Sequence, residues 1–274
     1  FAGMMFKTDN NGTAHMNNVK IHDNYVHDTI SEAVYLGSTQ SQPQHKFNNL
    51  EFYNNRLLRT GTEIAQFGNL GDNCRIHHNV FILGALAWKK PFQIYQDGGV
   101  QLSHREGSAS FDHNIVIGGA SNNMILFNPD VPGDVHQSGD VLSIHDNYFA
   151  YSRDTGVYIH SSSHDTKEVV FSGNYFSKVI FSYDELNPNT SDSQRIIRSF
   201  NQLNPITLSG NFYDSQVDQN FYSGYPNITA NNNQEQAIND VDGRVRIQVA
   251  IDALSILQTS LENDVLTKLQ AWQQ

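Results

Sequence analysis

The sequence has few charged residues and a single cysteine. Charged residues make up 16% of the 274 residues, and acidic residues outnumber basic ones by 28 to 17, which gives a formal net charge of −11. Because phosphate binding requires a basic surface, this excess of acid argues against nucleic acid as a partner. The lone Cys74 excludes an internal disulfide framework and a cysteine-based zinc site, so we expect it to be a small buried apolar residue.

Long apolar runs are also missing. No stretch is long enough for a membrane-spanning helix, and we therefore expect no membrane insertion. The sequence shows neither a signal peptide nor an initiator methionine, and it opens at Phe1 on residues that resemble the middle of a strand. We interpret the chain as a mature piece or a fragment of a longer protein with further domains.

What the sequence has in abundance is a repeat centred on asparagine. The motif is apolar-x-apolar-x-x-Asn followed by aromatic or apolar residues, as in "VKIHDNYVH" and "LSIHDNYFA". Such a period of a few tens of residues is typical of repeat architectures. Seven copies align on Asn24, Asn55, Asn79, Asn114, Asn147, Asn174 and Asn211.

The repeat has the pattern of strands. Before each asparagine, apolar and polar residues alternate, and a second alternating run follows about ten residues later in most copies, as in "EAVYLGS" and "TGVYIHSS". Two or three short strands per repeat, without a helical period, predict an all-β single-stranded solenoid, the parallel β-helix, of about seven to eight coils. The asparagine would then stand at the same corner of every coil and form a ladder of side-chain hydrogen bonds.

Several histidines precede the corner asparagine, namely His22, His77, His78, His113 and His145. Because their placement follows the repeat, we interpret them as hydrogen-bonding residues of the bend and not as metal ligands.

The repeat does not extend to the end of the chain. We predict a β-helix domain over residues 1–223, a polar linker over 224–239 and a C-terminal amphipathic α-helix over 240–274. Residues such as Ile247, Ile251, Leu254 and Leu261 recur there at helical spacing. This helix would cover the open end of the solenoid, with a linker or partner helix as the alternative.

The repeat, its asparagine corner and the "DNYVHD…EAVYLG" rhythm resemble the right-handed parallel β-helix family, whose superfamily includes pectate lyases, other polysaccharide lyases, epimerases and polygalacturonase-type hydrolases. The resemblance covers roughly residues 3 to 214. It implies a right-handed solenoid, a secreted or cell-surface bacterial protein, and a polysaccharide partner, often an acidic one.

The second strand of each coil offers a surface for such a partner. Alternation predicts that Val34, Leu36, Val100, Leu102, Val157 and Ile159 point inward. Their neighbours should line a groove of roughly 30 Å, since coils lie about 4.8 Å apart. The residues that we expect to contact substrate there are Tyr35, Gln66, Trp88, Gln101, Tyr158 and His160.

The third coil carries the strongest cluster for catalysis, within "AWKKPFQIYQDGGVQLSHREGS". β-Elimination of a uronic acid needs a cation that neutralises the carboxylate and a base that removes the C5 proton. Lys89, Lys90 and Arg105 are candidates for the cation, and Lys90, His104 or Tyr95 for the base. In the alternative, Lys89 and Lys90 are solvated and Arg105 pairs with a nearby carboxylate.

A cofactor is not required by any motif, although Ca²⁺ is a candidate for the acidic turns, with Asp72 and Asp97 as ligands. Hydrolysis would need two carboxylates about 5–10 Å apart. Glu63, Asp72 and Asp97 offer no tight pair, so hydrolysis is disfavoured. The sequence thus favours a polysaccharide lyase acting by β-elimination. The alternatives are a non-catalytic glycan-binding or adhesin-type module and a structural spacer.

Overall fold

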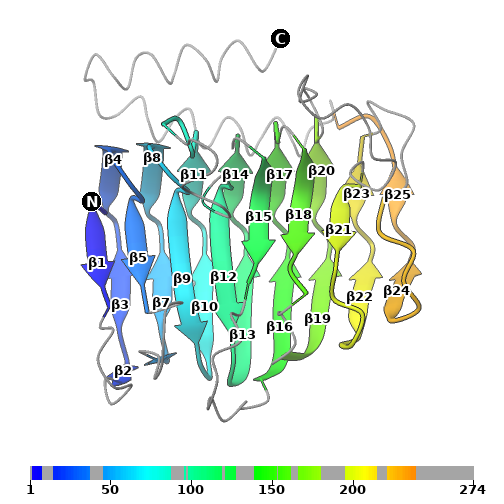
Figure 1. Cartoon of the computed structure of the whole chain (residues 1–274), viewed down its shortest axis with the longest axis horizontal. Coiled ribbons are helices and arrows are strands. Elements are labelled where there is room, and N and C mark those ends of the chain that lie inside the picture. The colour runs from blue at the N-terminus through cyan, green and yellow to red at the C-terminus, as the bar shows by residue number, and fades with distance from the viewer. Residues whose placement is uncertain are drawn as a thin grey trace.

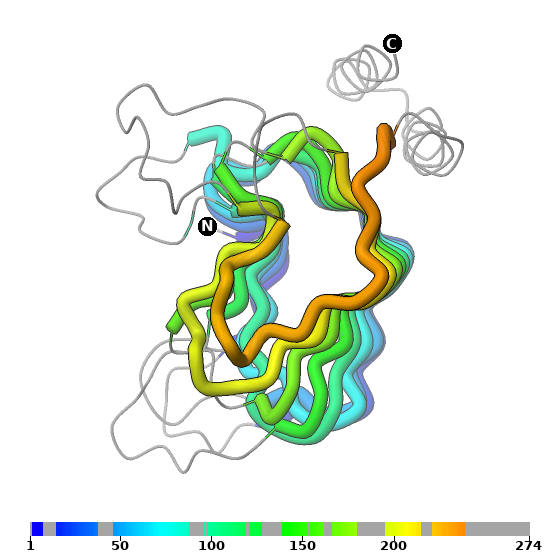
Figure 2. Tube along the Cα trace, turned by 90° about the vertical axis from the view of Figure 1, so that its right-hand side faces the viewer, coloured from blue at the N-terminus to red at the C-terminus, as the bar shows by residue number. Residues whose placement is uncertain are grey.

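The computed structural model describes residues 2–7, 15–37, 46–87, 96, 98–118, 121–127, 139–152, 154–161, 166–179, 195–214 and 221–238. All elements within these ranges are strands, which form three sheets (Figure 1). The chain passes through sheet B, sheet C and sheet A in turn, and strands of successive coils pair in parallel. Seen along the stack, the coils lie over one another around a common interior (Figure 2).

Sheet A has nine strands and carries the surface that the sequence assigns to substrate. Its main path runs through β1 (Met4–Phe6), β5 (Val34–Leu36), β9 (Ala65–Leu70), β12 (Val100–His104), β15 (Asn122–Leu126), β18 (Thr155–Ile159) and β21 (Ile197–Ser199). The short strands β2 (His15–Asn17) and β6 (Lys46–Asn48) pair beside this path.

Sheets B and C have eight strands each and flank the asparagine corner. Sheet B holds β3 (Lys20–His22), β7 (Glu51–Tyr53), β10 (Cys74–His77), β13 (Gly107–Asp112), β16 (Gly139–His145), β19 (Thr166–Ser172), β22 (Ile206–Ser209) and β24 (Ile228–Asn231). Sheet C holds β4 (Tyr25–Thr29), β8 (Arg56–Thr60), β11 (Val80–Ile82), β14 (Ile115–Ile117), β17 (Tyr148–Ala150), β20 (Tyr175–Ser177), β23 (Phe212–Tyr213) and β25 (Gln234–Glu235).

The asparagine ladder is confirmed, and its hydrogen bonds show why the residue recurs. The side-chain oxygen of Asn114, for example, accepts the backbone N–H of Asn79 at 2.9 Å and its Nδ2–H at 3.0 Å. The Nδ2 of Asn114 also donates to the carbonyl of Ile76 at 2.9 Å. Each buried amide therefore satisfies a backbone group that the bend removes from the sheets.

The bend itself depends on the residue before each ladder asparagine. That residue has a positive φ in every coil, between 52° and 63°, in the left-handed region that Gly, Asn, Asp and His tolerate best. The residues are Asp23, Asn54, His78, His113, Asp146, Gly173, Gly210 and Asn232. The sequence pattern "HDN", "HHN" and "SGN" is thus a backbone requirement.

The stack continues past residue 223, where the sequence analysis ends the β-helix. The expected linker 224–239 contains β24 and β25, which pair with β22 and β23 and add an eighth rung, Asn233, to the ladder. Asn233 accepts from the Nδ2 of Asn211 at 2.8 Å. The predicted C-terminal helix, 240–274, lies outside the described residues.

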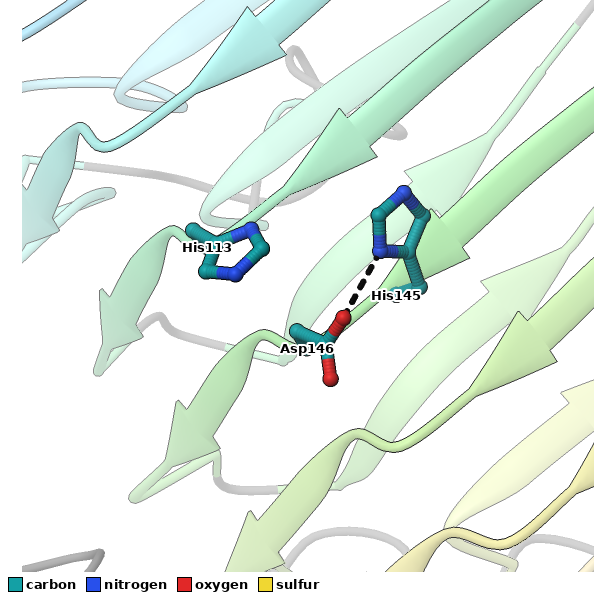
Figure 3. A group of neighbouring side chains, drawn as sticks. All are labelled: His113, His145 and Asp146. Atoms are coloured by element: carbon teal, nitrogen blue, oxygen red, sulfur yellow. Dashed lines mark hydrogen bonds and ion pairs between the residues drawn. The ribbon is translucent and has the colours of Figure 1, made fainter.

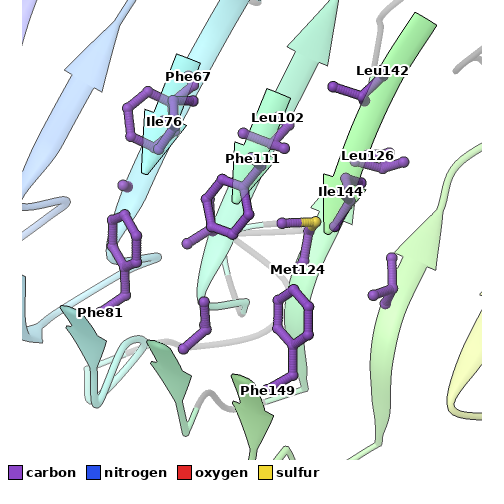
Figure 4. Close-up of a cluster of buried hydrophobic side chains, with 14 of the residues drawn as sticks. Phe67, Ile76, Phe81, Leu102, Phe111, Met124, Leu126, Leu142, Ile144 and Phe149 are labelled. Carbon is purple, nitrogen blue, oxygen red and sulfur yellow. The ribbon is translucent and has the colours of Figure 1, made fainter. Parts of the chain in front are cut away.

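The interior is a continuous apolar column. Phe81, Phe111, Phe149 and Phe176 are fully buried and succeed one another from coil to coil, with ring centroids 5.1 to 6.4 Å apart. Figure 4 shows the first three of these rings among their apolar neighbours. The six residues of sheet A predicted to point inward all belong to this core, which confirms the alternation: Val34, Leu36, Val100, Leu102, Val157 and Ile159. Cys74 is buried there too, as expected.

In the middle coils, over β11 and β14, both faces of sheet C are apolar. Leu58, Ile82 and Ile117 lie beside the inward residues and form a second buried cluster, to which Ile238 belongs. The local sequences "NVFILG" and "NIVIGG" are apolar without alternation, which is typical of a strand buried on both faces.

Candidate functional site

The candidate site lies on the outer face of sheet A, where two rows of side chains run across the coils. Register places Tyr35 opposite Gln66, Gln66 opposite Gln101, and Ile125 opposite Tyr158. The second row lies two residues further along each strand. It includes Ser103, Phe127 and His160, which follow the paired residues Gln101, Ile125 and Tyr158. Parallel coils thus bring residues far apart in sequence into two short lines.

On β5, β9 and β12, the outward side chains of this face are buried. Tyr35, Gln66 and Gln101 are predicted to contact substrate, yet they are only 6%, 4% and 3% exposed. Arg105, a predicted catalytic cation, is likewise buried. The outward direction of a residue does not by itself make it accessible. A polymer at the surface of the described structure cannot reach these side chains.

His104, a predicted base, is the last residue of β12, and its ring lies against the sheet B strands β16 and β19. It is 1% exposed, its Nδ1 lies 3.0 Å from the hydroxyl of Thr166, and its ring lies against Gly139. Burial lowers the pKa of His104 to about 4. Its imidazole is therefore neutral above that pH, and its contacts are those of a residue that fixes the corner between sheets.

The other members of the third-coil cluster are not in the described part of the chain. Trp88, Lys89, Lys90, Tyr95 and Asp97 lie outside the described residues. The adjacent Glu106 is described, and it forms an ion pair with Lys46 at 2.8 Å.

Asp72, the other predicted calcium ligand, has a structural contact. Its carboxylate accepts the backbone N–H of Ser108 at 3.1 Å, which ties two coils together at a turn. Within the described ranges, Asp72 belongs to no cluster of three potential metal ligands.

At the ends of β15, β18 and β21, the outward side chains of this face are aromatic and partly exposed. Tyr158 and Phe200 lie with ring centroids 5.4 Å apart, and His160 packs edge-on against Phe127 at 4.9 Å. Tyr158, His160 and Phe127 are half-buried, and Phe200 is 38% exposed. These rings, together with Arg198, form what we call the aromatic platform, carried by the ends of β15, β18 and β21.

Arg198 gives the aromatic platform a positive charge. Its guanidinium lies 4.7 Å above the ring of Phe200, and register places it opposite Tyr158. Asp154 approaches Arg198 at 3.9 Å, the outer limit of an ion pair. A planar guanidinium beside exposed rings suits a ligand that has both apolar faces and carboxylates.

Sequence reasoning found Tyr158 and His160 but not Phe127, Arg198 or Phe200. The segment "IIRSF" has the required alternation, with Ile197 and Ser199 facing the other way. The long interval between Asn174 and Asn211 concealed that this segment is the sheet A strand of its coil.

Comparisons with known proteins identify the fold family and no individual relative. The model of the family described as "Right handed beta helix region" matches residues 7–182. Neither the curated proteins nor the solved structures contain a significant match. Among the described residues, no helix has the length and apolarity needed to cross a membrane.

Proposed function

Since the chain belongs to the right-handed β-helix family, as the match over residues 7–182 shows, we propose that it is an extracellular protein that binds an acidic polysaccharide. The binding surface in this proposal is the aromatic platform on the outer face of sheet A. The observation that carries the proposal is the grouping of Phe127, Tyr158, His160 and Phe200, partly exposed, around the guanidinium of Arg198.

The chemistry of the platform supports a sugar ligand. Pyranose rings present flat C–H faces that pack against aromatic side chains, and tyrosine adds a hydroxyl at the polar edge. A uronate carboxylate beside Arg198 accepts charge-assisted hydrogen bonds from its guanidinium. The chain as a whole repels polyanions at net −11, so the local cation is what would favour an acidic polymer over a neutral one.

Binding is supported better than β-elimination by the described residues. His104 and Arg105 are buried, and an elimination base must reach the C5 proton of the substrate. Lyase activity through Lys89, Lys90 or Tyr95 stays a prediction, because these residues lie outside the described ranges. The experiment below reports on it separately.

Affinity electrophoresis tests the proposal. The whole chain is run through gels that contain alginate, pectate or chondroitin sulfate, with a neutral glucan gel as reference. We expect retardation by at least one acidic polymer. Tyr158→Ala and Phe200→Ala should each raise the dissociation constant about tenfold, since an aromatic contact contributes on the order of 1 kcal/mol beyond the area it buries. Arg198→Ala should weaken binding of the acidic polymer and leave any neutral binding unchanged.

Tyr53→Ala is the matched control. Tyr53 is also a half-buried tyrosine in a ring stack, between His22 and His77 at 4.7 and 5.2 Å, but it lies on sheet B. Equal retardation of Tyr158→Ala and wild type, or equal weakening by Tyr53→Ala, contradicts the platform. An increase in ultraviolet absorbance from unsaturated uronates would add lyase activity, whereas constant absorbance with retardation identifies a binding module.

A further inference from the structure

The corner between sheets B and C carries two rows of outward side chains that are independent of the aromatic platform. One row consists of the last residue of each sheet B strand, and register pairs these residues from coil to coil. The other row consists of the left-handed residues that follow. The first five members of the two rows are His22, Tyr53, His77, Asp112 and His145, and Asp23, Asn54, His78, His113 and Asp146.

In two adjacent coils these rows bring two histidines and an aspartate together. His113, His145 and Asp146 point toward one another (Figure 3), and their potential ligand atoms all lie within 4.8 Å of each other. The ring centroids of the two histidines are 6.0 Å apart. No other set of three potential ligands occurs in the part of the chain that the structure describes. The side chains are 31% to 47% exposed, so an ion reaches them from solvent.

Hydrogen bonds to carboxylates orient both rings. The Nδ1 of His113 lies 3.0 Å from a carboxylate oxygen of Asp112, and the Nδ1 of His145 lies 2.9 Å from one of Asp146. A carboxylate only accepts, so the Nδ1 of His113 carries the proton and its Nε2 retains a lone pair for a metal. The Nδ1 of His145 and the carboxylate of Asp146 face each other, and an ion bound between them releases their shared proton to solvent.

The carboxylate of Asp112 accepts a hydrogen bond from His113 and so orients its ring. The Asp112 side chain is fully buried and receives two bonds from the guanidinium of Arg75, at 3.0 and 2.7 Å, and one from Ser110. A carboxylate that accepts the far nitrogen of a histidine is the usual outer partner of a metal-bound imidazole.

Although the repeat alone favours a purely structural role for these histidines, we propose that His113, His145 and Asp146 bind a divalent ion of the zinc class, such as Zn²⁺, Co²⁺ or Ni²⁺. Two imidazoles with one carboxylate suit these ions, whereas Ca²⁺ takes six to eight oxygen ligands. Zinc–ligand bonds are about 2.0–2.2 Å long, so the side chains rotate inward and Asp146 exchanges its bond to His145 for the ion. The fourth position faces solvent.

The first coil contains a matched control. His22 and Asp23 occupy the same two rows and make the same contact, Nδ1 to carboxylate at 2.7 Å. The next coil, however, has Tyr53 and Asn54 at these positions, so only two ligands meet there. The pair at residues 22–23 should therefore bind the ion far more weakly than the three residues in coils four and five.

Calorimetric titration tests the site. The whole chain, freed of metal with a chelator, is titrated with ZnCl₂. We expect one ion to bind most tightly, and we expect His113→Asn and Asp146→Asn each to raise its dissociation constant at least tenfold. Asparagine suits both positions because it tolerates the left-handed backbone, with φ of 53° and 54° here, and Asn54 already occupies the same row. Asp23→Asn should leave the tightest dissociation constant unchanged.

A second measurement guards against a folding defect. Circular dichroism confirms that each variant is folded, and the visible spectrum of bound Co²⁺ shows whether nitrogen and oxygen ligands surround the ion. The proposal is overturned if no ion binds to the folded wild type. It is also overturned if the variants at residues 113 and 146 bind as tightly as wild type, or if Asp23→Asn weakens binding equally.

Discussion

Removal of a ladder asparagine should lower the free energy of unfolding by an amount that depends on how many buried hydrogen-bonding groups lose their partners. The side chain of Asn114 makes four hydrogen bonds: two to Asn79, one to Ile76 and one to Asn147 at 3.2 Å. Asn114→Ala leaves the buried backbone N–H of Asn79 without its acceptor, which costs about 1–3 kcal/mol, and each further bond contributes about 1 kcal/mol. With three further bonds, we therefore expect a loss of about 4–6 kcal/mol in the free energy of unfolding, a large share of the 5–15 kcal/mol typical of a folded protein.

Asn24→Ala is the control within the same ladder. Asn24 is the first rung and only part-buried, and its side chain donates to Asn55 at 2.9 Å and to His22 at 2.8 Å. The oxygen of Asn55 keeps the backbone N–H of Asn24 at 3.1 Å, so the control leaves no buried group unpaired. At about 1 kcal/mol for each of the two bonds, we expect a loss of about 2 kcal/mol. Urea unfolding followed by circular dichroism measures both variants, and equal losses would refute the argument from unsatisfied groups.

Two further predictions concern acid sensitivity and the thiol. Arg59 donates two hydrogen bonds of 2.7 Å to Asp28, which with His27 lower the pKa of Asp28 to about 2 against the opposing effect of burial. A lowered pKa stabilises the fold above pH 4, and this stabilisation is lost as the pH falls from about 4 through the folded-state pKa of about 2. The stability advantage of wild type over Asp28→Asn should therefore be about 1 kcal/mol at pH 7, after allowance for screening of a side chain that is one-third exposed. In urea titrations this advantage should be much smaller at pH 2, and an advantage at pH 2 equal to that at pH 7 contradicts the assignment. Burial raises the pKa of the Cys74 thiol to about 11, so a disulfide reagent at pH 8 should react with the native chain far more slowly than with the chain in urea, and equal rates would show that the thiol is accessible.

The fold was predictable because each coil repeats one backbone requirement. A left-handed residue followed by an asparagine marks every corner, and both residue types are visible in the sequence. The eighth rung, Asn233, was missed because it lies in the run "ANNNQEQ", where several asparagines compete for the corner and the flanking strands contain few apolar residues.

The accessible part of sheet A was harder to predict. Alternation separates the two faces of a strand, and it assigned Val100 and Leu102 to the core correctly. It does not determine whether an outward residue is exposed, because exposure depends on segments distant in sequence. Gln101 and Tyr158 hold equivalent positions in the pattern, yet Gln101 is buried and Tyr158 is half-exposed.

The corner rows suggest how a structural repeat acquires binding chemistry. A left-handed position favours glycine, asparagine, aspartate and histidine, and two of these four are metal ligands. Stacking then places such residues about 4.8 Å apart in adjacent coils without any loop to position them. His113 above Asp146 follows directly from this geometry, whereas the glycines at 173 and 210 hold the same backbone without ligands. A change of one residue type at a corner is therefore enough to create or remove a site while the ladder beneath it stays intact.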